Sequence, residues 1–394
     1  DYTHDFPGVA YKSEIEVWKS ICPDPNLLFL EPALEPQSRP SDAELIDYRK
    51  KHLGKGLSLS YDQPLYMVRG MGAYLIDAWG RKYLDTVNNV AHAGHEHPEV
   101  VKAGREQMAL LNTNTRYLHE NINILAQELL DTLPPELCVV HFVNSGSEAN
   151  ELALRMAKTV SRQKDVLASE IGYHGNTNAC IEVSSYKFDG QGGSGCPEHT
   201  HLFPLPDTFR GKYRGKNTAG DYANDLKKQI EILKQKGRSP AAMIIEPIIS
   251  CGGQIPLPEG FLSMAFEYTR DAGGLCISDE VQVGCGRMGK YFWGFELHKV
   301  IPDIITIGKP LGNGHPIAAV VGRGDVMEAA QDSFISSTYW TEGVGPAAAL
   351  ATIRKMQRVD VRAHIARIGT MLREGIVQLA QKHGLPLSSF GHPP

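Results

Sequence analysis

The alternation of short apolar segments with helical patterns, from about residue 100 onward, constrains the fold most strongly. Between the apolar segments lie helical patterns, and the clearest one spans residues 149–160, where apolar residues recur at i, i+3, i+4, i+7, i+8 and i+11. Short apolar strands joined by helices are typical of a largely parallel sheet covered on both faces, so we expect an α/β fold. The strand candidates are Cys138–Val143, Met243–Ile245, Leu275–Ser278, Ile304–Ile307 and Ile317–Val321.

Composition excludes several classes of protein. Of the 394 residues, 42% are hydrophobic and 22% are charged, which is typical of a globular chain and excludes bulk disorder. The net charge of −5 argues against binding nucleic acid through bulk positive charge. No apolar run approaches the roughly 20 residues that a membrane helix needs, and no basic-then-apolar leader opens the sequence. We therefore expect a soluble, cytoplasmic protein with neither a membrane nor a nucleic acid as partner.

The seven cysteines form no CxxC pair. An odd, scattered set in a chain of this length is typical of reduced thiols in a cytosolic protein. We expect all seven to be small apolar packing residues.

The distribution of prolines and apolar patterns suggests four segments. Residues 1–40 contain five prolines between positions 23 and 40 and read as a leader or linker. Residues 41–85 would begin with a helix at Ser41, which Glu44 caps, continue into strands near 66–70 and 74–77, and contribute to a small domain. Residues 86–328 would form the large domain. Residues 329–394, with a helix over 361–382, would form a smaller C-terminal domain that is incomplete here, and because the sequence begins with Asp1 we expect an excerpt of a longer protein.

The segment Gly284-Cys285-Gly286-Arg287-Met288-Gly289 has the spelling of a dinucleotide-binding motif. Such glycines open a helix in a nucleotide-binding βαβ unit. Here the aromatic run 291–295 follows instead, so we do not expect a nicotinamide cofactor.

Four other segments carry stronger signals. Asn144 to Asn150 joins a strand to the amphipathic helix, and a small-residue turn at a helix N-terminus forms an anion site, although Ser145 and Glu148 also fit a simple capping box. Asp279 follows a buried strand, at the sheet edge where α/β proteins bind ligands. Lys309 follows the next strand and is a candidate Schiff-base nucleophile, although a lysine before a proline is more often a solvated charge. Tyr173 places an aromatic ring after the strand near 166–168.

One cofactor uses all four features, namely pyridoxal 5′-phosphate. It needs an anion cradle for its phosphate, a lysine for the imine, a carboxylate at its ring nitrogen, and flat or branched side chains against the ring. The carboxylate keeps the ring protonated, so that the ring can accept electrons from a substrate carbanion.

On these residues the sequence resembles the class III aminotransferases, which are fold-type I pyridoxal-phosphate enzymes with a large domain and a smaller α/β domain. The resemblance covers roughly residues 60–325 and includes the spacing between Asp279 and Lys309. It implies that Gly146 and Ser147 hold the cofactor phosphate, Tyr173 stacks on the ring, Asp279 pairs with the ring nitrogen, Val281 lies on the opposite face, Gln282 approaches the ring hydroxyl, and Lys309 is the imine lysine and proton shuttle. It further implies a homodimer in which Thr338 reaches the cofactor phosphate of the neighbouring subunit. Glu246-Pro247 and the glycine-rich segment after Asp279 also match the family.

Within the family, the segments 88–98, 112–119, 186–188 and 207–215 resemble the ethanolamine-phosphate and phosphohydroxylysine phospho-lyases. Arg210, Lys212 and Arg214 form a cationic cluster able to bind a phosphate dianion, with Arg116 a further candidate, although a solvated basic loop is equally consistent. His92, His95 and His97 lack a metal-ligand register, so no metal is expected. Both a transaminase and a phospho-lyase acting on a primary amine remain open, and so does a catalytically inert module of a larger protein.

Overall fold

The computed structural model describes residues 40–113, 117–190 and 192–392. The expected leader, apart from Pro40, and the candidate Arg116 lie outside these residues. Within the described ranges no helix is long and apolar enough to cross a membrane.

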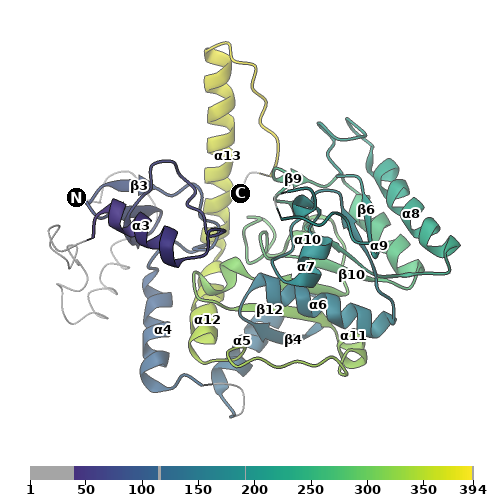
Figure 1. Cartoon of the computed structure of the whole chain (residues 1–394), viewed down its shortest axis with the longest axis horizontal. Helices are drawn as coiled ribbons and strands as arrows, with labels where there is room; N and C mark the ends of the chain where they lie inside the picture. The colour runs from purple at the N-terminus through teal and green to yellow at the C-terminus, as the bar shows by residue number, and fades with distance from the viewer. Residues whose placement is uncertain (1–39, 114–116, 191, 393–394) are drawn as a thin grey trace.

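A seven-stranded sheet forms the centre of the molecule (Figure 1), with the strand order β4-β12-β11-β10-β7-β5-β6. β12 is antiparallel to both of its neighbours, whereas the pairs between β11, β10, β7, β5 and β6 are parallel. The strands are β4 (Leu137–Val143), β5 (Asp165–Ser169), β6 (Thr200–Phe203), β7 (Pro240–Ile245), β10 (Leu275–Asp279), β11 (Ile304–Ile307) and β12 (Ala318–Arg323).

Helices cover both faces of the sheet. Successive residues of a strand point to opposite faces, and because the central strands are apolar at successive positions, both faces must be covered. On β7, Ile244 packs into the cluster that contains the buried face of α6, whereas Met243 packs against α8 and α9. On β11, Ile305 and Ile307 face a third cluster that includes residues of α5 and α12. The helices are α4 (Pro98–Leu110), α5 (Glu120–Leu130), α6 (Gly146–Ser161), α7 (Asn178–Val183), α8 (Ala219–Gln235), α9 (Phe261–Asp271), α10 (Gly294–Leu297), α11 (Gly324–Ala329) and α12 (Val344–Met356).

The N-terminal described segment forms a small unit beside α4 (Figure 1). Helix α3 (Asp42–His52) begins with the expected capping box, in which Ser41 and Glu44 bond reciprocally. Strands β1 (Met67–Met71), β2 (Tyr74–Asp77) and β3 (Lys82–Leu84) form an antiparallel sheet. The sequence predicted β1, β2 and the turn at Gly72, but it did not predict β3, and Gly70 lies within β1 rather than in the turn.

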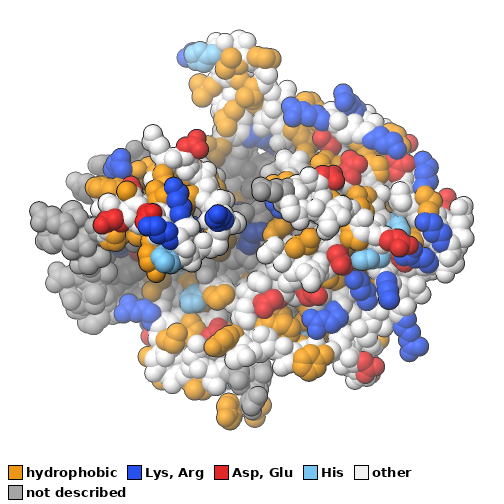
Figure 2. Space-filling model, in the orientation of Figure 1, with side chains coloured by type: hydrophobic (Ala, Val, Ile, Leu, Met, Phe, Trp, Pro, Cys, Tyr) orange, Lys and Arg blue, Asp and Glu red, His pale blue; other side chains and the backbone are white. Residues whose placement is uncertain are grey.

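At the other end of the chain, α12 packs into the body while α13 (Val359–Lys382) extends away from it (Figure 1). Ala349, Ile353 and Met356 of α12 are buried against the sheet face that contains Ile307. The projecting end of α13 carries exposed apolar side chains (Figure 2), among them Leu372 and Leu379.

The expected strand and helix segments are present, with differences at their ends and in direction. β7 begins at Pro240 rather than at residue 243, and β12 begins at Ala318 rather than at residue 317. The sequence did not predict β6 or the short pair β8 (Ile248–Ile249) and β9 (Ile255–Pro256). It also gave no sign that β12 runs antiparallel.

The cysteine expectation is partly wrong. All six described cysteines are free, and Cys180, Cys276 and Cys285 are buried as expected. Cys138, Cys196 and Cys251 are exposed instead, the first of them because it occupies an exposed position of β4, so they are not packing residues.

Candidate active site

A cavity of about 380 Å³ lies where the N-terminus of α6 meets the carboxyl ends of β5, β7, β10 and β11. This edge of an α/β sheet is the usual place for a ligand. The structure brings seven of the predicted site residues to the cavity wall, namely Gly146, Ser147, Tyr173, Asp279, Val281, Gln282 and Lys309.

The N-terminus of α6 forms one wall of the cavity. Ser145 is its N-cap and accepts a hydrogen bond from the N–H of Glu148 at 3.2 Å, whereas the Glu148 side chain accepts from the N–H of Asn144 at 2.9 Å, so the reciprocal capping box is not formed. A Cβ on Gly146 would lie 2.7 Å from Cγ1 of Val281, so only glycine lets the helix approach this close. The first backbone N–H groups and the positive end of the helix dipole therefore face an open space that suits an anion.

Ser147 extends this wall with a hydroxyl. Its Oγ accepts a hydrogen bond from the N–H of Asn176 at 3.0 Å, which leaves the hydroxyl proton free to be donated. Gly175 has a φ of +135°, and a Cβ there would lie 2.7 Å from Oγ of Ser147. The loop after Tyr173 therefore needs glycine in order to pack beside the helix terminus.

Asp279 ends β10 and is 3% exposed. Its Oδ2 accepts hydrogen bonds from Nδ2 of Asn150 and from Nδ1 of His174, both at 2.8 Å, while Oδ1 accepts from the N–H of Val281 at 3.0 Å. A buried carboxylate with this many donors is stabilised in one orientation at the cavity wall.

Glu246, after β7, is a second buried acid at the same cavity. Ser250 donates both its N–H and its hydroxyl to Oε2 of Glu246. Burial, followed by the negative charge of Asp279, raises the pKa of Glu246 above its ordinary value. Two acids share this edge of the sheet, and the burial of Glu246 favours its protonated form.

Two further side chains shape the cavity. Tyr173 is half-buried, and burial is the main reason why the pKa of its hydroxyl is raised. Gln282 accepts a hydrogen bond from Nδ2 of Asn89 at 3.2 Å, which ties the loop at residues 86–96 to the cavity. The apolar face of Val281 and the ring of Tyr173 supply flat and branched surfaces along the wall.

Lys309 is the first residue of the 3-10 turn η3 (Lys309–Gly312), which joins β11 to β12. It is half-buried and lines the cavity, and no carboxylate of the described residues forms an ion pair with it. Asn313, after the turn, adopts a left-handed backbone, and its side chain bonds the N–H of Ala93 and the carbonyl of Gly94. Lys309 is thus held on a short turn, which the two hydrogen bonds of Asn313 attach to residues 93 and 94.

The cationic cluster lies elsewhere. Lys212 forms an ion pair with Asp225 at 2.7 Å, and Arg214 donates to backbone carbonyls of its own loop. Arg210, Lys212 and Arg214 are all exposed, and none lines the cavity. In the described chain these residues form a solvated basic loop, and their binding of substrate stays a prediction.

Thr338 is exposed and does not line the cavity of its own chain. Its loop is held close to α6, because Nδ2 of Asn144 donates to the carbonyl of Tyr339 at 2.8 Å and Nε1 of Trp340 donates to Glu148 at 3.2 Å.

Two other sequence patterns have structural explanations. The glycine-rich segment 284–289 forms turns and opens no helix, as expected from the aromatic run that follows it. His95 pairs with Asp85 at 2.7 Å, and His92 is buried, which together with the charge of Arg287 lowers the pKa of its ring to about 3. Among the described residues no group of three or more His, Cys, Asp or Glu side chains could hold a metal ion.

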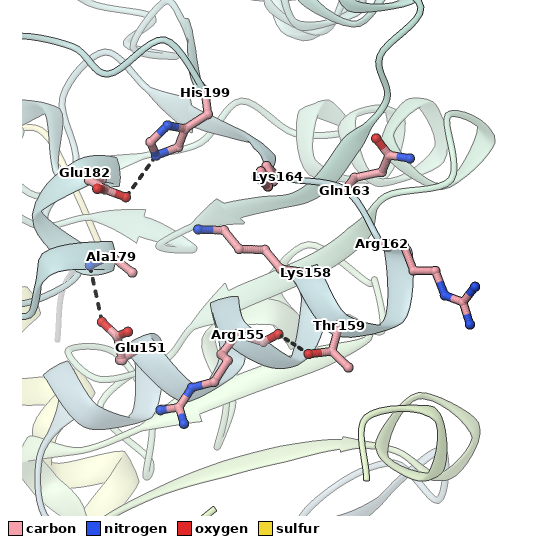
Figure 3. A pocket seen from close by; sticks show the side chains of 10 residues that line it. All are labelled: Glu151, Arg155, Lys158, Thr159, Arg162, Gln163, Lys164, Ala179, Glu182 and His199. Carbon is pink, nitrogen blue, oxygen red and sulfur yellow. Dashed lines mark hydrogen bonds and ion pairs between the residues drawn. The ribbon is translucent and has the colours of Figure 1, made fainter. Parts of the chain in front are cut away.

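A second cavity, of about 570 Å³, lies at the other end of α6 (Figure 3). Arg155 and Lys158 extend into it from the helix, and Glu182 and His199, which pair at 2.9 Å, form another wall. None of the predicted site residues lies there.

Sequence reasoning missed the roles of Asn150, His174 and Thr306 around Asp279. Asn150 lies three residues after Ser147 and therefore on the same face of α6. Thr306 is the one polar residue in the apolar strand 304–307. A polar side chain inside a buried strand was the signal available in the sequence.

The mostly parallel sheet with helices on both faces is the α/β fold of the fold-type I class, and the cavity at the carboxyl edge of this sheet is the candidate site. A family model described as aminotransferase class-III matches residues 58–387. The chain therefore belongs to the class III aminotransferase family.

Individual relatives agree with this assignment. The chain is 41% identical to "Alanine--glyoxylate aminotransferase 2-like" of Drosophila melanogaster, over 87% of this chain and 71% of the relative. It is 35% identical to "Ethanolamine-phosphate phospho-lyase homolog 1" of Caenorhabditis elegans, over 87% and 76% of the two chains. A phospholyase from Arthrobacter, solved in complex with phosphoethanolamine, superposes with a TM-score of 0.79 at 34% identity and covers 86% of this chain and 80% of its own.

Proposed function

We propose that the cavity binds pyridoxal 5′-phosphate and that the chain uses it to transform a primary amine. The observation that carries this proposal is that Asp279 and Lys309 line one cavity together with the glycine-based N-terminus of α6. The residues fit the cofactor. Glycine at position 146 lets the helix terminus lie against Val281, where a Cβ would be too close, and the terminus offers free N–H donors for a phosphate.

The residues have distinct tasks in this proposal. Gly146 and Ser147 hold the phosphate, Tyr173 and Val281 contact the two faces of the ring, and Gln282 reaches the ring hydroxyl. When bound, the cofactor supplies an electron-accepting ring conjugated to the substrate amine. Asp279, fixed by its three short hydrogen bonds, faces the ring nitrogen as an anion and favours the protonated ring. Lys309 holds the cofactor and then moves a proton at the amine-bearing carbon through Nζ.

A phosphorylated amine such as phosphoethanolamine is the first substrate to test. The similarity to a phospho-lyase homologue and to a phospholyase solved with phosphoethanolamine supports this choice. Transamination is the second candidate, because a relative named as an aminotransferase is 41% identical over most of the chain. The two differ in products, since a lyase releases phosphate and ammonia without an acceptor, whereas a transaminase needs a 2-oxo acid.

The substrate assay separates these reactions. The protein is incubated with phosphoethanolamine, with and without a 2-oxo acid, and phosphate and ammonia are measured. Phosphate release without the acceptor supports the lyase, and turnover that requires the acceptor eliminates it in favour of transamination.

Replacement of Lys309 tests the cofactor site itself. We expect the purified protein to absorb near 410–430 nm, as is typical of this cofactor bound to a lysine. Lys309→Ala should abolish this band and lower the turnover number by about 10³-fold or more, because both the tether and the proton carrier are lost. Lys187→Ala, which removes an exposed lysine of η2 (Ser185–Lys187) outside the cavity lining, is the matched control and should keep the band. A wild-type protein that stays colourless with added cofactor favours the inert module, and a band that persists in Lys309→Ala overturns the assignment of the lysine.

We also propose that the active protein is a homodimer in which Thr338 completes the partner's site. Leu110 and Tyr339 are 81% and 68% exposed, and the loop that contains Tyr339 contacts the end of α4 through the bond from the N–H of Gly343 to Asn112. Exposed apolar side chains beside an exposed Thr338 suit contact with a second copy of this chain. Sedimentation at micromolar concentration should give a dimer, and a monomer with full activity would contradict the shared site.

The cytoplasm is the proposed location. The six described cysteines are free, which suits a reducing compartment. Two of the relatives are named as mitochondrial proteins, so fractionation of cells that express the full open reading frame is the appropriate test.

A further inference from the structure

Beneath Asp279 lies a buried polar cluster that joins three elements of the fold. Asn150 comes from α6, Thr306 from β11 and His174 from the loop after β5, and all three are at most 3% exposed. Each is separated from Asp279 by at least 27 residues in the sequence. Asn150, His174 and Asp279 border the cavity, and all members of the cluster are at most 3% exposed, so the hydrogen bonds within it are shielded from bulk water.

The amide of Asn150 is the centre of the cluster. Its Nδ2 donates to Oδ2 of Asp279 and to the carbonyl of His174, both at 2.8 Å. Its Oδ1 accepts from the hydroxyl of Thr306 at 2.6 Å. Three of the hydrogen-bonding positions of the amide are therefore satisfied by three different segments of the chain.

These partners allow only one orientation of the amide. If the amide turned over, its oxygen would face the Asp279 carboxylate and the His174 carbonyl, both of which are acceptors. The hydroxyl of Thr306 has a single proton, and the bond to Asn150 at 2.6 Å is much shorter than the 3.5 Å separation from Oδ1 of Asp279. The Asp279 carboxylate and the His174 carbonyl therefore set the orientation of the amide, and the Thr306 hydroxyl restrains its position by donating to its oxygen.

We propose that Asn150, restrained by its hydrogen bond from Thr306, is a positioning residue that fixes the Asp279 carboxylate toward the cofactor ring. This inference rests on the proposed cofactor site. Asn150 and His174 both donate to Oδ2 and hold it from inside the protein, so that the carboxylate cannot rotate about its terminal bond without losing two buried hydrogen bonds. The carboxylate is thereby held as the fixed negative partner of the ring nitrogen, without reorganisation when the cofactor binds.

Other titratable groups also face Asp279. Glu246 after β7, Glu280 after β10 and Cys180 of α7 lie close enough to interact with its charge, together with His174. Variants at Asn150 and Thr306 leave all of these groups in place. A change in the pH profile of the bound cofactor in these variants therefore reports on how Asp279 is positioned.

The experiment compares Asn150→Asp, Asn150→Leu and Thr306→Val in the full chain. Asn150→Asp keeps the shape but places a carboxyl group against Oδ2 of Asp279, so the pair must retain a proton. Asn150→Leu removes the donor, and Thr306→Val removes only the hydrogen bond that restrains the amide oxygen. Thr352→Val is the matched control, because Thr352 is equally buried and bonds only the carbonyl of Ala348 on α12.

Two readouts are measured besides activity, namely the pH midpoint of the cofactor absorbance near 410–430 nm and the dissociation constant of the cofactor. We expect Asn150→Asp and Asn150→Leu to shift the midpoint by about one pH unit and to weaken cofactor binding about tenfold. Thr306→Val should shift both in the same direction by less, and Thr352→Val should leave both as in the wild type. If an Asn150 variant fails to fold, the comparison of Thr306→Val with Thr352→Val still tests the positioning role.

The outcomes separate this inference from the proposed function. If the folded Asn150 and Thr306 variants keep the absorbance, the pH midpoint and the cofactor dissociation constant of the wild type, the positioning role is wrong. The proposed cofactor site is not affected by that result. Equal shifts in Thr306→Val and Thr352→Val also overturn it, because loss of packing then explains the result. A wild-type protein that never binds the cofactor contradicts the proposed function itself.

Discussion

The two ends of α6 present two cavities, and the smaller one has the features of an active site. At the N-terminal end, about 380 Å³ of space is lined by groups that the fold holds fixed, including Asp279 with its buried donors. At the C-terminal end, about 570 Å³ is lined by Arg155, Lys158 and Lys164, and no carboxylate of the described chain forms an ion pair with them. This difference indicates that an active site is recognised by polar groups held in a fixed orientation, and not by the volume or the net charge of a cavity.

The helix itself explains this difference. Its N-terminus leaves backbone N–H groups unpaired and directed at the strand ends, and glycine at position 146 allows close contact with residue 281. Its C-terminal half carries the half-buried cations Arg155 and Lys158, which form no ion pair among the described residues, so their removal is expected to cost little stability.

The largest effect that would test this comparison is expected for Asp279→Asn. Loss of the charge should lower the turnover number by about 10²–10³-fold, because the stabilisation of the protonated ring is lost. The measurement is steady-state kinetics at saturating cofactor.

Asp165→Asn is the matched control, because Asp165 is also a buried strand carboxylate but pairs with Arg238 and His201 away from the cavity. It should reduce the free energy of unfolding by roughly 3 kcal/mol and leave the turnover number of the folded enzyme unchanged. If Asp279→Asn and Asp165→Asn lower the turnover number equally, the effect is not specific to the carboxylate at the smaller cavity.

The next effect concerns stability and pH at Glu280, beside Asp279. Burial is the main cause that raises the pKa of Glu280 from 4.5 to about 7. Between these two values the folded protein keeps a proton that the unfolded chain has lost, so the free energy of unfolding falls as pH rises, by about 3 kcal/mol in total, and levels off above pH 7. Glu280→Gln should remove this contribution, as measured by urea unfolding at pH 5 and pH 8.

Glu182→Gln provides the control for that slope. Glu182 lies in the larger cavity with a side chain that is 39% exposed, and its replacement should leave the decline between pH 5 and pH 8 as in the wild type. If Glu280→Gln also keeps the full decline, Glu280 is not its source.

The smallest effect is expected in the larger cavity. The double variant Lys158→Ala, Lys164→Ala should change the ratio kcat/KM by less than about twofold and the free energy of unfolding by no more than about 0.5 kcal/mol. Kinetics and urea unfolding measure both quantities. A fall of tenfold or more in kcat/KM would show that this surface takes part in catalysis.

The sequence predicted the parts of the fold that are locally encoded. The apolar runs at 138–143 and 304–307 and the spacing in 149–160 depend only on neighbouring residues, and the structure confirms them as β4, β11 and α6. β6 was not predicted, because its four residues lie at the edge of the sheet and mix polar with apolar side chains. The direction of β12 depends on its pairing with β4, which lies far away in the sequence.

The candidate site shows the same division. Motif spacing placed Gly146, Tyr173, Asp279 and Lys309 at one cavity, although their roles stay predictions. The bonds among Asn150, His174 and Thr306 were not predicted, since they join residues brought together only by the sheet. The loop at 207–215 has a cationic sequence, but the pairing of Lys212 with Asp225 emerges only when α8 packs beside it.

The antiparallel β12 has a consequence for how the protein is synthesised. β12 pairs with β4 on one side and with β11 on the other. The turn η3, which carries Lys309, is therefore fixed at both ends only after residues 318–323 have paired with residues 137–143. While the ribosome is still translating the segments between β4 and β12, the cavity wall at Lys309 is incomplete. The cavity is therefore among the last features of the central sheet to be completed.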